Sequence, residues 1–413
     1  MPFEPGSPGH VAEHNAIVRC LNTAEVVGNY STAARTGTDI TAALNAAIAA
    51  GASAPYGRDN VQWFHTGTQH RPRIALPPGR FLVSDLAAIT YPNGKLVGAG
   101  SDQTILHYRN ASGGTLFTFG TFDQTPDPAF QGGAGGWTIE GLTIVNDLEW
   151  HGGGLGYGTE GARTTTAIRD NHNGGFRLHD VRIKGFRYGF AGVTGSDYTT
   201  FDRCHIDRCD VGIYLGPSSQ QVDIHRCQID NCREGIVLDE APQGRIASCW
   251  MNDNTWSAVV FEVADVSRFG IASFAGVGGQ AQWTISDCWL ENAADPTSDR
   301  VAQYGLVRTR TVGTVASSPR WIEMANCYVV AGAPSDSYAF KRSVLRVDAG
   351  DRIKLTNVRV TGKLDAIVHN ASGGTPKVHQ ADTALAPGTT IPAWLDGSTA
   401  AAWSGATSSD TFA

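Results

Sequence analysis

Leu178-His-Asp-Val-Arg-Ile183, Phe201-Asp-Arg-Cys-His-Ile206 and Ile224-His-Arg-Cys-Gln-Ile229 are three copies of one short pattern in a chain of 413 residues. Their final isoleucines are equally spaced, and a fourth copy, Ile246-Ala-Ser-Cys-Trp-Met251, follows at an interval shorter by one residue. Apolar side chains alternate in each copy, with the period of two that is typical of a β-strand. A unit this small cannot bury its apolar residues alone. Repetition at this period therefore predicts coils stacked into a parallel β-helix.

Two later copies, Ile285-Ser-Asp-Cys-Trp-Leu290 and Ile322-Glu-Met-Ala-Asn-Cys-Tyr-Val329, extend the pattern into columns. One column predicted to point inward contains Leu142, Val181, Cys204, Cys227, Cys249, Cys288, Cys327 and Val358. A second inward column contains Ile144, Ile183, Ile206, Ile229, Met251, Leu290, Val329 and Val360. The column between them must point outward, because successive strand residues face opposite ways; it contains Thr143, Arg182, His205, Gln228, Trp250, Trp289, Tyr328 and Arg359.

The cysteines allow two interpretations. A metal site is one, since several cysteines and histidines lie close together in the sequence (Cys204, His205, Cys209, His225, Cys227, Cys232). The repeat, however, places the sulfurs inside and both histidines outside, and free cysteine is among the most buried residue types. We therefore predict a ladder of reduced thiols, no metal and no other cofactor. Reduced thiols fit a protein made in a reducing cytosol.

Composition excludes some classes of protein. Charged residues are only 17% of the chain, whereas 49 glycines exceed the usual share, a balance that suits an all-β repeat. A net charge of −7 without a basic stripe argues against nucleic acid as the main partner. No apolar run is long enough for a membrane span, and the first residues show no secretion signal.

The segments before the repeat predict an end cap. Residues 36–50 read as an Ala-rich helix in which Thr38 or Asp39 caps the start and Gly51 ends the helix. Its apolar face would cover the open end of the first coil, which would otherwise expose core and strand edges. Ile74–Val83 and Lys95–Gly100 then predict a strand, a turn and a second strand.

This order of segments resembles the start of the pectate-lyase-like right-handed β-helix superfamily. The resemblance rests on Thr-Asp before an Ala-rich helix, then Leu76-Pro-Pro-Gly-Arg-Phe-Leu-Val83, then Leu96-Val-Gly-Ala-Gly100, with Gly-Ile-Tyr-Leu215 and Gly-Ile-Val-Leu238 in later coils. It implies an all-β, single-stranded right-handed parallel β-helix over residues 31–370 with an N-terminal capping helix. Residues 371–413 would be a C-terminal cap or tail. That superfamily holds lyases, hydrolases, fructotransferases, epimerases and tail-spike depolymerases, so the fold alone does not name the chemistry.

A second resemblance concerns residues 1–30. Gly9-His-Val-Ala-Glu-His-Asn-Ala-Ile17 is similar to the short opening segment of many phage tail-fibre and tail-spike proteins. It implies an N-terminal attachment-like segment, a trimeric assembly and a place in a phage tail made in the host cytoplasm.

Acids on the outward face are the candidate catalytic groups, because glycoside hydrolysis needs two carboxyls. Asp207 and Asp230 occupy equivalent positions in successive copies and fall in one outward column with Glu291; their mutual repulsion would raise the pKa of one of them. Asp210 and Glu234 precede the two Gly-Ile strands, where polygalacturonase-like hydrolases carry acids, although their Asn-Thr-Asp, Asp-Asp and Gly-His-Gly signatures are missing here. Asp197 resembles one acid of an inulin-fructotransferase pair whose second position is Arg208. Glu240 and Glu262 are a weaker fourth pair. Each acid can also be an ordinary solvated or turn-capping residue.

Outward aromatic residues suggest where a sugar binds. Trp250, Trp289 and Tyr328 follow one another in one column, and sugar rings stack on exposed aromatic faces. Burial under the 263–282 insertion or against a neighbouring subunit is the alternative. His205 and Arg233 are further binding candidates, and His225 shares the face of His205.

These observations predict a glycoside hydrolase, a depolymerase that cleaves a cell-surface polysaccharide with paired carboxylates. A lyase ranks lower, since it needs a Lys or Arg base and often Ca²⁺. The other rivals are a fructotransferase unrelated to phage and a non-catalytic receptor-binding tail protein.

Overall fold

The computed structural model describes residues 36–53, 73–110, 113–120, 135–147, 164–171, 174–254, 256–265, 267–271, 282–292, 305–312, 320–331, 343–347, 351–361, 366–370, 377–381, 384–385, 393–397 and 402–404. The predicted N-terminal segment, residues 1–30, lies outside these ranges.

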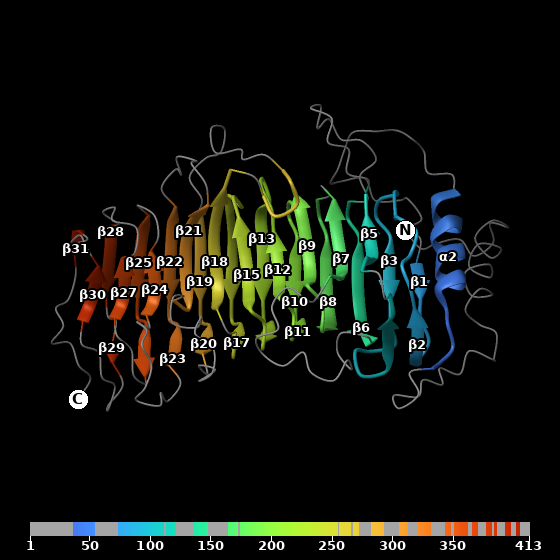
Figure 1. Ribbon diagram of the computed structural model, residues 1–413, viewed down its shortest axis with the longest axis horizontal. Helices are drawn as coiled ribbons and strands as arrows, with labels where there is room; N and C mark the ends of the chain where they lie inside the picture. The colour runs from blue at the N-terminus through green and yellow to red at the C-terminus, as the bar shows by residue number, and fades with distance from the viewer. Residues whose placement is uncertain are drawn as a thin grey trace, which may run out of the picture.

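The described strands form one elongated stack of coils, with the chain advancing one coil at a time from α2 to β31 (Figure 1). Every strand pair in it is parallel. A 21-stranded sheet contains two ladders that share the long strands β6 (Thr138–Asn146) and β8 (Arg177–Lys184). The first ladder also contains β1 (Arg73–Ala75), β3 (Lys95–Val97), β10 (Thr200–Asp202), β13 (Gln220–His225), β16 (Gln243–Ala247), β19 (Gln282–Ser286), β22 (Trp321–Ala325), β25 (Arg352–Thr356), β28 (Lys377–Ala381) and β31 (Ala402–Ser404).

The second ladder contains β2 (Gly79–Val83), β4 (Thr104–Tyr108), β11 (His205–Asp207), β14 (Gln228–Asp230), β17 (Trp250–Asn252), β20 (Trp289–Asn292), β23 (Tyr328–Ala331), β26 (Arg359–Thr361) and β29 (Ala384–Leu385). A separate 10-stranded sheet, here called sheet 2, contains β5 (Thr115–Phe119), β7 (Thr166–Asn171), β9 (Tyr188–Thr194), β12 (Val211–Leu215), β15 (Glu234–Asp239), β18 (Ser257–Ala264), β21 (Val307–Val312), β24 (Ser343–Val347), β27 (Ala366–Asn370) and β30 (Ala393–Gly397).

The predicted columns are confirmed. His205 pairs with Arg182 and with Gln228, and the register continues through Trp250, Trp289, Tyr328 and Arg359. Both inward columns are buried along their whole length. Since each coil contributes one residue to each column, equivalent side chains lie one strand spacing apart, about 4.8 Å.

A sharp corner joins the two ladders in the coils from β8 to β26. The residue at this corner has a positive φ, between 49° and 55°, in seven coils: Asp180, Arg203, Arg226, Ser248, Asp287, Asn326 and Asn357. A left-handed residue turns the chain abruptly without leaving the parallel stack. The alternating pattern alone did not predict this corner.

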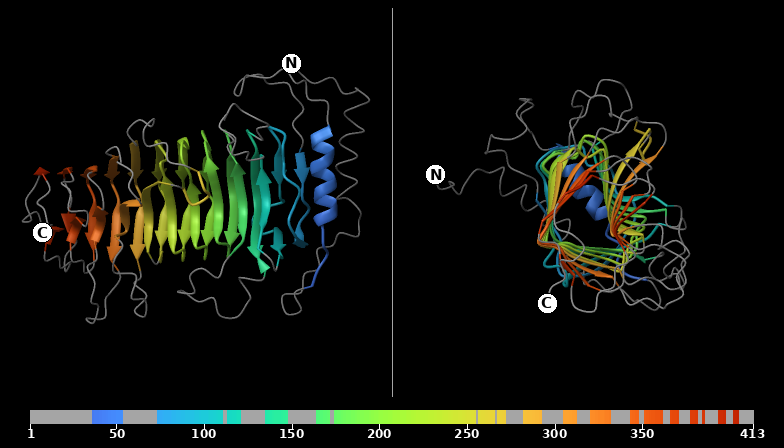
Figure 2. Two further views of the ribbon diagram at one scale, coloured as in Figure 1. Left: turned by 45° about the horizontal axis from the view of Figure 1, so that its top comes forward. Right: turned by 90° about the vertical axis from the view of Figure 1, so that its left-hand side faces the viewer.

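The helix α2 (Thr41–Ser53) lies across the N-terminal end of the stack (Figure 2). Asp39 caps it, because its Oδ1 accepts the Thr41 N–H at 2.8 Å, and Ile40, Leu44 and Ile48 are buried. The predicted end at Gly51 is wrong, since the helix continues to Ser53. Gly51 is needed for contact instead: a Cβ there would lie 2.4 Å from Tyr91 Oη.

Both ladders and sheet 2 continue beyond residue 370. β28 pairs with β25, β30 with β27, and β31 with β28. The described part of residues 371–413 therefore adds coils to the stack.

The buried cysteines lead to a first prediction. All seven described cysteines are free and buried. Hydrogen bonding between neighbouring thiols, together with burial, raises the pKa of Cys249 and raises that of Cys288 to about 12. In a Cys20→Ser variant we expect almost no labelling by a thiol reagent in the native state and full labelling in denaturant. Rapid native labelling would contradict the inward assignment.

Candidate functional site

The outward column of the second ladder forms an exposed aromatic strip. The side chains of Trp250 and Trp289 are 51% and 40% exposed, and Tyr328 is partly exposed. The ring centroids lie 5.9 Å apart for Trp250 and Trp289 and 4.5 Å apart for Trp289 and Tyr328. Within the 263–282 insertion, Phe269 packs on tyrosines of sheet 2, so residues 267–271 do not bury this strip.

The structure places Asp207 and Asp230 in register on adjacent strands, β11 and β14. Their side chains are only 9% and 7% exposed. Asn231 Nδ2 donates to Asp207 Oδ1 at 2.9 Å, and Lys184 Nζ lies 3.7 Å from Asp207 Oδ2. His205 Nε2 lies 3.3 Å from Asp230 Oδ2, which also accepts a hydrogen bond from Gln228. Gln228 is in register with Trp250, so the carboxylates lie next to the aromatic strip.

Asp197 and Asp210 have structural contacts. Asp197 braces a turn: its Oδ1 accepts the Gln220 N–H at 3.0 Å, and its Oδ2 accepts from Gln220 Nε2 at 3.3 Å. Asp210 is buried immediately before β12. Glu234 pairs with Val211, so Asp210 and Glu234 are one position out of register.

Glu234 belongs to a buried ionic cluster on the outer face of sheet 2. Arg268 donates to Glu234 at 2.7 Å and makes two hydrogen bonds to Glu262, at 3.1 and 2.9 Å. Arg310 reaches both acids from β21. Burial would raise the pKa of both carboxyls, but the two guanidinium groups outweigh it and hold the pKa of Glu234 and of Glu262 below its ordinary value.

Asp239 is a further acid of this face that sequence reasoning missed. It is in register with Glu262, where the sequence had suggested Glu240. Tyr214 Oη donates to Asp239 Oδ2 at 2.6 Å, whereas the buried Asp239 Oδ1 has no hydrogen-bond partner among the described residues. Burial, and then the charge of Glu262, raise the pKa of Asp239 to about 7.

Residues 267–271 cover this cluster. Phe269 packs between Tyr188 and Tyr214, with ring centroids 5.0 and 5.2 Å away, while Arg268 reaches the acids. The only sequence signal was the presence of three acids, Glu234, Asp239 and Glu262, in strands whose other residues are mostly apolar. Nothing in the repeat indicated that residues 267–271 would meet them.

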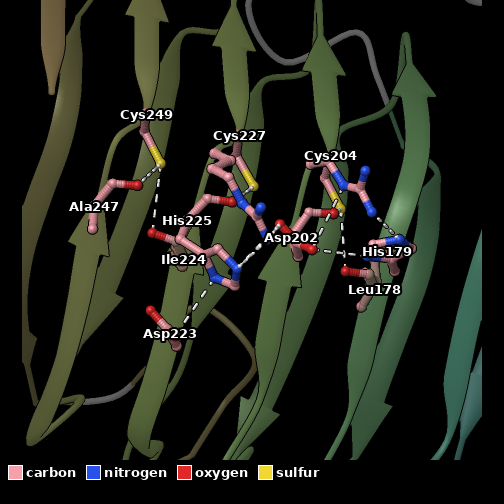
Figure 3. A network of polar contacts seen from close by, with 12 residues as sticks. Leu178, His179, Asp202, Cys204, Asp223, Ile224, His225, Cys227, Ala247 and Cys249 are labelled. Atoms are coloured by element: carbon pink, nitrogen blue, oxygen red, sulfur yellow. Dashed lines mark hydrogen bonds and ion pairs between the residues drawn. The ribbon is translucent and has the colours of Figure 1, made fainter. Parts of the chain in front are cut away.

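A third network lies where the first ladder meets the corner (Figure 3). Asp202 sits between His179 and His225, with its oxygens 2.9 Å from His179 Nδ1 and 3.1 Å from His225 Nε2. His225 Nδ1 is 3.5 Å from Asp223. His225 and His205 both face outward, as predicted. Figure 3 also shows Cys204, Cys227 and Cys249 side by side in one row on successive coils.

Arg233 stacks over Trp256, 4.2 Å from its ring centroid, at the corner between β14 and β15. Among the described residues no group of three or more His, Cys, Asp or Glu side chains is placed to hold a metal ion. In the same ranges, no helix is long and apolar enough to cross a membrane.

Comparisons with known proteins concern the fold. Residues 130–307 match the family model described as a right-handed beta helix region. No curated protein matches. Three solved structures are similar: ORF18 of Geobacillus virus E2 (14% identity, TM-score 0.52), a catalytic domain of a GH87 alpha-1,3-glucanase in complex with tetrasaccharides (12%, 0.53), and DFA-IIIase from Arthrobacter chlorophenolicus A6 in complex with GF2 (14%, 0.54).

The coverage differs between the three. The matches cover 95%, 82% and 92% of this chain, and 63%, 64% and 85% of the virus protein, the glucanase and the DFA-IIIase. The chain thus spans less than two thirds of the first two. Identities this low establish the fold alone. Together with the parallel ladders, these matches identify the chain as a right-handed parallel β-helix protein.

Proposed function

We propose that this protein binds a polysaccharide along the second ladder and hydrolyses it with Asp207 and Asp230. The observation that carries the proposal is the exposed stack of Trp250, Trp289 and Tyr328 in the column next to those acids. Large exposed aromatic rings on successive coils are costly to hydrate and match the apolar faces of sugar rings. The oligosaccharide complexes of the glucanase and the DFA-IIIase support a carbohydrate ligand for this fold.

Asp207 and Asp230 are assigned the chemistry because of where they lie. One carboxylic acid would protonate the glycosidic oxygen, and the other carboxylate would attack the anomeric carbon or activate water. Adjacent coils supply a separation near one strand spacing. Both side chains retain some exposure, whereas Asp239 and Glu262 lie under residues 267–271. His205, Gln228 and Asn231 hold the two carboxylates in place.

The binding half of the proposal is tested at Trp289. Trp289→Ala is expected to weaken polysaccharide binding about tenfold, because stacking on an aromatic ring contributes roughly 1–2 kcal/mol. Titration with host-cell polysaccharide, followed by intrinsic fluorescence, measures it. Trp321→Ala is the matched control, since Trp321 is 43% exposed but belongs to the first ladder. Equal effects of both substitutions would contradict a strip-specific site.

Product analysis separates the rival activities. New reducing ends support hydrolysis, a cyclic disaccharide supports a fructotransferase, and an unsaturated sugar supports a lyase. Binding without any product supports a receptor-binding protein.

We further propose that the chain acts as a homotrimer in a phage tail. The opening segment and the fold similarity to a virus protein support this assignment. Light scattering that gives the mass of a single chain would contradict the trimer.

A further inference from the structure

Two arginines, Arg203 and Arg226, stand at unusual backbone positions beside the proposed glycan site. At the corner between the ladders, five of the seven described residues with positive φ are Asp, Asn or Ser. Arg203 and Arg226 occupy the other two, with φ of 53° and 54°. A long side chain gains nothing from this conformation, which Asn and Asp tolerate best. The next corner repeats the pattern, with Arg208 at 53° where the following coils have Asn231 and Asp253.

The guanidinium groups of Arg203, Arg226 and Arg245 are held by less exposed side chains of the first ladder. Arg226 Nη2 lies 2.7 Å from Asp202 Oδ1, and Arg203 Nη2 lies 2.6 Å from His179 Nε2. Arg245 donates twice to Asp223, at 3.2 and 3.3 Å. In each of the three, Nη1 has no partner among the described residues. Arg donates through a rigid fork, so an anchored guanidinium still presents donors outward.

Arg203, Arg226 and Arg245, together with Asp202 and Asp223, form a patch in which the cations are more exposed than the anions. The arginine side chains are 56%, 56% and 57% exposed, whereas those of Asp202 and Asp223 are 12% and 34% exposed. Three cations and two anions leave the patch net positive even with neutral histidines, on a chain whose net charge is −7. The acids thus form an inner layer, and solvent meets the cations.

The patch and the aromatic strip are continuous. The corner column runs from Arg203 through Arg226 to Ser248, and Ser248 is two residues before Trp250. A glycan stacked on Trp250 and extending toward the N-terminal coils would pass beside Arg226 and Arg203.

We propose that Arg203, Arg226 and Arg245 form a subsite for anionic groups of the glycan, so that the substrate is an acidic polysaccharide. This inference rests on the proposed function and adds the class of its substrate. The group recognised is a carboxylate or a sulfate or phosphate ester, which a guanidinium binds through paired hydrogen bonds. A neutral glycan would leave these donors to water.

The test compares three oligosaccharide probes of equal length: a polyuronate, a sulfated glycan and a neutral glucan. Wild-type protein is expected to bind an anionic probe at least about tenfold tighter than the neutral one at low salt, with the preference falling as salt rises. The tighter anionic probe identifies the group. The double variant Arg203→Gln/Arg226→Gln is expected to lose about tenfold for that probe and to bind the neutral glucan unchanged. Arg352→Gln, an exposed arginine of the same sheet outside the patch, is the control and should change neither.

Equal wild-type affinity for charged and neutral probes would overturn the inference and leave the proposed function intact, and so would equal losses for both probes in the double variant. Tight binding of a single-stranded oligonucleotide at the same salt would also overturn it, because the patch would then recognise any polyanion. If no glycan binds and Trp289→Ala has no effect, the proposed function fails as well. Thermal unfolding of each variant shows whether it is folded.

Discussion

Asp207→Asn and Asp230→Asn are each expected to lower the rate of reducing-end formation by about 10²–10⁴-fold while leaving glycan binding within a few-fold of wild type. Asn keeps the shape of the side chain and its hydrogen bonds to Asn231, Gln228 and His205 in part, but it cannot donate an acidic proton or act as an anionic nucleophile. Reducing-end assays at saturating polysaccharide measure the rate, and fluorescence titration measures binding.

Two controls locate the chemistry. Glu323→Gln removes an outward carboxylate of the first ladder that pairs with Lys354, and it should leave turnover within a few-fold of wild type. Asp239→Asn tests the acid pair on sheet 2. If that variant loses activity while Asp207→Asn and Asp230→Asn retain it, cleavage occurs on sheet 2 and the assignment to the second ladder is wrong.

Asp239→Asn is also expected to change how stability depends on pH. The folded pKa of Asp239 is raised from 3.8 to about 7, so the native state holds a proton that the unfolded chain releases. Below about pH 4 the carboxyl is protonated in both the folded and the unfolded state, so its titration does not lower the free energy of unfolding. As pH rises toward 7 its cost grows to about 4 kcal/mol, from roughly three pH units at 1.36 kcal/mol each, and is constant above that. Asn has no such cost.

Urea unfolding at about pH 5, 6, 7 and 8 measures the effect. The stability of Asp239→Asn minus that of wild type should increase from low to high pH, because only wild type loses stability in that window. The difference between the two proteins at low pH measures the effect of the altered contact with Tyr214. The growth of that difference with pH measures the cost of ionising Asp239 in the folded state. Parallel curves for the two proteins would show that Asp239 is ionised in the folded state. Glu323→Gln, at a half-buried pair with Lys354 on the first ladder, is the matched control and should give such parallel curves.

Most of the coil architecture could be predicted because its cause is repetitive. The alternation of apolar residues shows which face of the strand each residue lies on. The nearly equal spacing of the copies shows which residues of adjacent coils are neighbours, such as Cys204, Cys227 and Cys249. The aromatic strip and the register of Asp207 with Asp230 follow from the same rule. The cap at Asp39 followed from local chemistry, whereas Gly51 did not end the helix because its lack of a side chain serves Tyr91.

The cluster on sheet 2 could not be predicted, for two physical reasons. First, the length of a coil varies: the interval from Asp239 to its partner Glu262 is one residue longer than the interval from Ile229 to its partner Met251. Spacing alone therefore cannot decide between Asp239 and Glu240 as the partner of Glu262. Second, Arg268 comes from an insertion outside the repeat, and no periodicity says which face an insertion covers.

Asp197 is a turn-capping residue, the alternative stated above, but the sequence could not name Gln220 as its partner. Its contact with Gln220 depends on a local backbone path that residue types do not specify.

The stacking of whole coils has a consequence for evolution. A duplication or deletion of one complete coil preserves every ladder, because each strand bonds only to the strands before and after it. Such an event between Asp230 and Trp250 would change the distance between the proposed catalytic carboxylates and the proposed sugar-binding strip by one coil. Under the proposed function, the length of the released product would then change by one coil spacing per event. The catalytic and sugar-binding residues themselves would stay the same.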